Sequence, residues 1–179
     1  MLTPQGRKEQ SHDALRRARE KGAEVLPLPI IGERFEFRLT TATGETVDSE
    51  SYRGKVLLID GWATWCTPCM QKMPGLKELY DKLHRQGFEI IGVNFDNKPS
   101  RGRAAIEKLE LKWTHVLVPA DDETRELFDE ASSFMPLPRL VLIGRDGNVA
   151  AVCSPGELEE EVTKLVKRPL ATQPAPASP

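Results

Sequence analysis

The sequence predicts an α/β fold with a mixed central sheet. The apolar run Val56–Ile59 is typical of a buried strand, and from Pro68 onward the apolar residues recur at helical spacing. A second apolar run, Leu140–Ile143, is followed by Asp146-Gly147, which is turn chemistry that favours a hairpin. A strand followed by a helix implies parallel pairing at the centre of the sheet, and the hairpin adds antiparallel pairing.

The N-terminal segment, residues 1–27, is polar and charged, and we expect it to be an extension outside the folded domain of residues 28–167. Its Ala and Leu positions over residues 10–20 predict a helix that ends at Gly22. We find no apolar segment of a signal peptide and no run long enough to span a membrane. A domain cut from a longer secreted precursor is the alternative interpretation.

A hairpin is predicted at the start of the domain. Phe35, Phe37 and Leu39 alternate with charged residues, which is the period of a half-buried strand. The tripeptide Thr43–Glu45 is turn chemistry, and Val47 begins the expected return strand.

The central strand ends at Asp60, and a helix begins near Pro68. The apolar face of this helix consists of Leu76, Leu79, Tyr80 and Leu83.

The middle of the chain predicts a further alternation of strands and helices. The predicted elements are a strand over residues 88–96, a helix from the cap Ser100 to Leu109, a strand over residues 113–118, and a helix capped by Asp121 or Asp122 that continues through Phe128.

The last predicted elements are a strand that contains Cys153 and an amphipathic helix over residues 157–167. Residues 168–179 are rich in Pro and Ala, and we expect a disordered tail there.

Bulk properties exclude several classes of function. The net charge of -2 and the sequence pI near 6.0 give no basis for binding nucleic acid. Three cysteines cannot form a disulfide framework, so the close pair Cys66 and Cys69 indicates redox chemistry or a metal. Zinc needs two further ligands, but the three histidines stand at unrelated positions and no second CxxC follows. We therefore predict no metal and no other cofactor.

The cysteine pair stands where a strand delivers the chain to the start of a helix. The first amides of a helix lack intrahelical partners, and the helix dipole favours an anion there, so a thiolate on Cys66 is stabilised. A thiol of pKa about 8.5 is about 3% ionised at pH 7, whereas one of pKa about 7 is half ionised. We expect Cys66 to be the exposed nucleophile and Cys69, one turn on, to be the buried resolving thiol.

The string Trp62-Ala63-Thr64-Trp65-Cys66-Thr67-Pro68-Cys69 resembles the thioredoxin superfamily, and within it the TlpA/ResA-like (redoxin, AhpC/TSA-like) thiol-disulfide oxidoreductases. Pro74 stands where these proteins kink the active-site helix, and Leu137–Ile143 is similar to their cis-proline strand. The resemblance implies a three-layer α/β/α sandwich with an N-terminal hairpin and a strand-helix insertion in the middle of the domain.

The resemblance also implies roles for two charged residues. Thioredoxin carries a buried Asp at the position of Asp60, which is thought to relay the proton of the inner cysteine, and burial would make it a usable base for Cys69. An ordinary strand-end Asp that faces water is the alternative. Lys72 replaces a Glu that is frequent in ResA-like proteins, and it either modulates the dithiol and pairs with Asp60 or is a solvated lysine.

The substrate-binding residues come from two segments. Pro138 is expected to be cis, so that an extended substrate segment pairs with the backbone of Leu137. Thr67 and Pro68 lie between the cysteines, and we expect Trp65 to be exposed beside them while Trp62 is packed. We expect Cys153 to be a buried, inert thiol, and a role as third redox participant is the alternative.

The predicted function is thiol-disulfide exchange with protein disulfide substrates, in the reducing direction because Thr67-Pro68 adds no cation to the thiolate. One alternative is a thiol peroxidase of peroxiredoxin type, although Ile59 and Ala63 replace the Pro and Thr or Ser expected upstream of its cysteine. The other is a redox-inactive peptide-binding module, which has no need of an intact CxxC.

The resemblance further implies a periplasmic or other extracytoplasmic setting and a membrane thiol carrier as electron donor. A cytoplasmic location is the alternative, and we expect a monomer.

Overall fold

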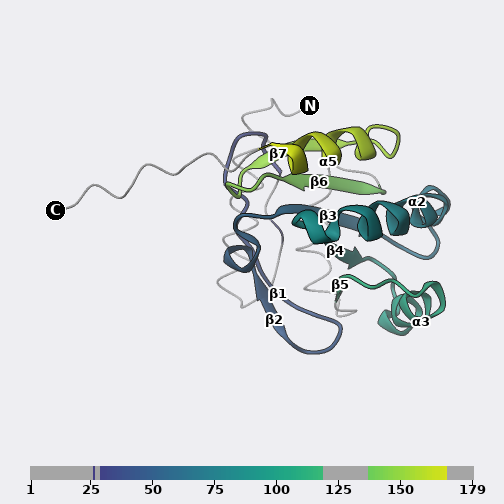
Figure 1. The fold of residues 1–179 in the computed structure, drawn as a ribbon. Helices are drawn as coiled ribbons and strands as arrows, with labels where there is room; N and C mark the ends of the chain where they lie inside the picture. Colours follow the sequence, from purple (N-terminus) through teal and green to yellow (C-terminus); the bar gives the residue numbers. More distant parts are fainter. Residues whose placement is uncertain (1–25, 27–28, 119–136, 169–179) are drawn as a thin grey trace, which may run out of the picture.

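The computed structural model describes Leu26, residues 29–118 and residues 137–168. Figure 1 shows the central sheet with its helices and the separate N-terminal hairpin. The predicted helices at residues 10–20 and 121–128, and the predicted tail, lie outside the described residues.

A mixed sheet of five strands forms the centre of the fold, in the order β5-β4-β3-β6-β7. β3 pairs in parallel with β4, and β4 with β5, while β6 is antiparallel to both β3 and β7. The mixed α/β class is thereby confirmed. The strands are β3 (Val56–Trp62), β4 (Phe88–Asn94), β5 (Thr114–Leu117), β6 (Arg139–Ile143) and β7 (Val149–Cys153).

The central strand is buried along its whole length, and it is paired with a neighbouring strand on each edge. The predicted N-terminal hairpin is also present, as β1 (Arg38–Thr40) and β2 (Thr46–Asp48). Phe35 and Phe37 are buried as expected, but they precede β1, so the regular strand is shorter than the alternation suggests.

Helix α2 (Thr67–Leu83) follows the central strand directly, and its four predicted apolar positions are all buried. Its last turn is followed by the short 3-10 helix η2 (His84–Gln86), and another, η1 (Ser49–Tyr52), follows β2. Helix α5 (Leu158–Lys167) packs against β3, β7 and α2, as the amphipathic pattern predicts. The described helices include none that is both long and apolar enough to cross a membrane.

Helix α3 (Pro99–Leu109) connects β4 to β5. The predicted cap at Ser100 is wrong: the N-cap lies two residues earlier, at Lys98, whose side chain makes no capping bond. Proline is well suited to the first helical position because its missing N–H is not needed there, so Pro99 defines the start.

Candidate active site

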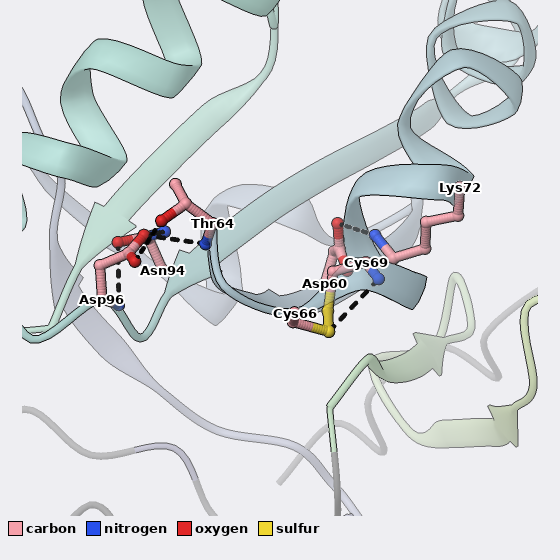
Figure 2. The surroundings of a disulfide bond; sticks show 7 residues. All are labelled: Asp60, Thr64, Cys66, Cys69, Lys72, Asn94 and Asp96. Atoms are coloured by element: carbon pink, nitrogen blue, oxygen red, sulfur yellow. Dashed lines mark hydrogen bonds and ion pairs between the residues drawn. A yellow bond between two sulfur atoms is a disulfide. The ribbon is translucent and has the colours of Figure 1, made fainter.

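The cysteine pair closes a disulfide at the junction of β3 and α2. Cys66 is the N-cap of α2, and its Sγ accepts a hydrogen bond from the backbone N–H of Cys69 at 3.3 Å. The two sulfurs are bonded, with the Cα atoms 5.2 Å apart (Figure 2). Pro68 stands in the first turn, where it costs no hydrogen bond. The sulfur of Cys66 therefore occupies the positive end of the helix dipole.

The exposure of Cys66 corrects our expectation. Cys69 is fully buried, as expected, but Cys66 is buried too, with 5% of its surface exposed. The physical reason is that the sulfur is bonded to Cys69 and turned towards the helix amide. Trp65, 61% exposed, stands outermost beside it, while Trp62 is fully buried, as we expected for this pair.

Asp60 forms a buried ion pair with Lys72. The Lys72 Nζ lies 2.6 Å from the Asp60 Oδ2, and the two side chains are 7% and 0% exposed (Figure 2). The alternatives of a solvated Asp60 and a solvated Lys72 are therefore excluded. Burial raises the pKa of Asp60, and the Lys72 ammonium opposes this only in part. Oδ1 has no hydrogen-bond partner within the described part of the chain.

The proline loop lies against the end of the central strand. The peptide bond between Leu137 and Pro138 is cis. Gly61 pairs with Arg139 across the β3–β6 ladder, and a Cβ at Gly61 would stand 3.4 Å from the Leu137 side chain. The fold thus brings Leu137 next to the strand that leads into the cysteines, although Leu137 follows Gly61 by 76 positions in the sequence. Thr67 and Pro68 are exposed at the start of α2.

Three further polar residues at this end of the sheet were missed by the sequence analysis. Thr64, Asn94 and Asp96 are joined by hydrogen bonds on the side of the turn away from Lys72 (Figure 2). The signal in the sequence is that two polar residues flank Phe95 at the end of an apolar strand.

Cys153 lies in β7, in register with Leu140, which is itself in register with Asp60. It is a free, buried thiol, and burial, with Glu161 and Glu157 nearby, raises its pKa. A thiol with a raised pKa is a poor nucleophile at neutral pH.

The proteins similar to this chain include thiol-disulfide oxidoreductases. The chain is 27% identical over 136 residues to a thiol-disulfide oxidoreductase ResA of Bacillus thuringiensis subsp. konkukian, covering 76% of each chain. It is 30% identical over 138 residues to the ResA of Halalkalibacterium halodurans, covering 75% of this chain and 76% of that protein.

Among solved structures, the thioredoxin domain of a thiol-disulfide oxidoreductase from Bacteroides vulgatus matches with a TM-score of 0.67 at 26% identity. That match covers 77% of this chain and 99% of the other. The fold class and the family resemblance expected from the sequence are thereby confirmed.

The family model described as Redoxin matches residues 31–167, which include both cysteines, Asp60 and the cis-proline strand. The chain therefore belongs to the Redoxin family, among the ResA-like members of the thioredoxin superfamily.

Proposed function

We propose that this protein reduces disulfide bonds in protein substrates through the Cys66–Cys69 dithiol. The observation that carries the proposal is the position of Cys66: it caps α2, and its sulfur accepts the Cys69 N–H while it is bonded to the Cys69 sulfur. In the reduced protein, the same amide and helix dipole favour a thiolate at this sulfur.

The reaction has two exchange steps. The Cys66 thiolate attacks one sulfur of the substrate disulfide, the substrate S–S bond breaks, and the other substrate sulfur leaves as a thiolate. Cys69 then loses its proton and attacks the Cys66 sulfur, which breaks the mixed disulfide and releases the second substrate thiolate. Two electrons pass from the dithiol to the substrate, and the Cys66–Cys69 disulfide remains.

Asp60 is the proposed acceptor of the Cys69 proton. Lys72 follows Cys69 by three residues, so the two side chains lie on the same face of α2, one turn apart. Because the Lys72 ammonium contacts Asp60 at 2.6 Å, the carboxylate faces that side of the helix. Burial raises the pKa of Asp60 towards the range in which a carboxylate can take a proton at neutral pH. The Lys72 ammonium opposes the effect of burial, so it favours the charged carboxylate that can accept a proton.

Substrate binding is assigned to the exposed surface around the disulfide. Trp65 offers an exposed aromatic face, and Thr67 and Pro68 are exposed beside it. An extended substrate segment would pair with the backbone of Leu137, which precedes Pro138 at the end of the central strand.

The residues between the cysteines and the family resemblance support a direction for the reaction and an electron donor. Thr67-Pro68 adds no cation between the cysteines, which favours a reducing couple. The family resemblance supports a membrane thiol carrier as the donor and an extracytoplasmic compartment, and we expect a monomer.

The test is insulin reduction by dithiothreitol, followed by turbidity, with three cysteine variants. We expect Cys66→Ser to abolish the acceleration and Cys69→Ser to accumulate a mixed disulfide with insulin. Cys153→Ala is the matched control, because it removes the cysteine outside the pair, and it should retain the rate. A fully active Cys66→Ser variant would contradict the proposal.

A further inference from the structure

We infer that Asp96 is a positioning residue, which holds the active-site turn through Thr64 and so keeps the Cys66 sulfur at the helix amide. The inference rests on the proposed dithiol chemistry and deepens it. It adds residues on β4 and just beyond it to a site otherwise built from β3, α2 and the proline loop.

The first step is the contact between Asp96 and the turn. The Thr64 hydroxyl donates to Asp96 Oδ1 at 2.6 Å, and the Thr64 backbone N–H donates to Asp96 Oδ2 at 3.1 Å (Figure 2). One carboxylate thus holds both the main chain and the side chain of a single residue. Thr64 stands two residues before Cys66, so these two hydrogen bonds hold the turn that precedes the nucleophile.

The second step is that Asp96 is itself held rigidly. The Asn94 Nδ2 donates to Asp96 Oδ2 at 2.8 Å, and the Asp96 backbone N–H donates to Asn94 Oδ1 at 3.2 Å. Both side chains are buried, with each residue 1% exposed. A buried carboxylate is tolerated only when donors replace its water, and bonds to a charged acceptor are stronger than neutral ones.

The third step concerns the helix behind Asn94. Gly102 of α3 is buried, and a Cβ at this position would overlap the Asn94 carboxamide oxygen. The absence of a side chain therefore lets α3 pack directly onto the residue that supports Asp96. The backbone also joins the two strand ends, since the Phe95 N–H donates to the Trp62 carbonyl at 2.8 Å.

The fourth step links the turn to the sulfur. The Cys66 N–H donates to the Ala63 carbonyl at 3.1 Å, so the turn closes on itself around Thr64. A shift of Thr64 would move Cys66 relative to the amide of Cys69, which its sulfur contacts at 3.3 Å. Since the bond to a thiolate is sensitive to distance and direction, loosening the turn weakens the stabilisation of the nucleophile.

The test measures the rate of iodoacetamide alkylation of Cys66 in the reduced protein across a pH series, in a Cys69→Ser, Cys153→Ala background. The variants are Asp96→Asn and Thr64→Val, with Thr64→Ser as the conservative rescue that retains the hydroxyl donor. We expect the first two to move the alkylation midpoint to higher pH and to slow the reaction at pH 7 by about threefold to tenfold.

The direction of the shift separates positioning from a simple charge effect. Removing a nearby negative charge would by itself favour the thiolate and move the midpoint of Asp96→Asn to lower pH. Asp48→Asn is the matched control: Asp48 likewise accepts from the backbone N–H and the hydroxyl of one residue, Ser51, but at the start of η1. It should leave the midpoint unchanged.

An unchanged or lowered midpoint in Asp96→Asn, or an unchanged midpoint in Thr64→Val, overturns the inference while the proposed function stands. If Asp96→Asn does not fold, the Thr64→Val and Thr64→Ser pair decides alone. If Cys66 in the parent background already titrates like a free cysteine, the proposed chemistry itself fails, and the inference fails with it.

Discussion

Removing the cation from the buried Asp60–Lys72 pair should destabilise the protein in a manner that depends on pH. In Lys72→Met, the Asp60 carboxylate would keep its full burial and lose the ammonium that contacts it at 2.6 Å. Breaking a buried pair in this way typically costs about 3–5 kcal/mol.

The sign of the pH dependence follows from the raised pKa of Asp60. Above a pH of about 4 the unfolded chain releases this proton while the folded protein retains it, so stability falls as pH rises, by up to about 1.4 kcal/mol per pH unit. The fall ends at the folded pKa, which burial already raises in the wild type and which loss of Lys72 would raise further. The deficit of Lys72→Met should therefore grow as pH rises from 5 to 8.

The assay is urea unfolding of the oxidised protein at pH 5 to pH 8. Lys82→Met is the matched control on the same helix, because Lys82 pairs with Glu159 at the surface, where both side chains are more than half exposed. Such a pair contributes about 0–1 kcal/mol. The double variant Asp60→Leu/Lys72→Met should recover most of the loss, because no buried charge is left alone. Equal stability of Lys72→Met and wild type at pH 8 would refute the reasoning.

Two further predictions concern His115 and Trp65. Burial lowers the pKa of His115 to about 4, so the folded protein resists protonation and loses up to about 3 kcal/mol as pH falls from about 6.5 to about 4. In His115→Phe, the free energy of unfolding measured in urea should fall less between pH 6.5 and pH 4 than in the wild type. An equal fall in both proteins would show that other groups cause it. Trp65→Ala should change the free energy of unfolding by about 0.5 kcal/mol or less, since the side chain is 61% exposed, yet raise the KM for insulin several-fold. A KM equal to that of the wild type would show that Trp65 does not contribute to substrate binding.

Some residues of the site are neighbours in the chain, and others are brought together only by the pairing of strands. Cys66 and Cys69 are neighbours in the chain, so their contact is local and follows from three-residue spacing at a helix start. Leu137 reaches the same site only because β6 pairs with β3, which sets its neighbour Pro138 beside the end of the central strand.

The sequence by itself determined the local elements: the buried strand β3, the start of α2 at the cysteines, and the hairpin of β6 and β7. Hydrophobic periodicity and turn chemistry act over a few residues, so they can be recognised in the sequence without knowledge of the fold. Only the tertiary structure decided that Lys72 pairs with Asp60, that Cys66 is buried, and that Asp96 holds Thr64. These outcomes depend on which polar groups lose their contact with water when the chain packs. Such burial arises only when segments that are distant in the sequence meet.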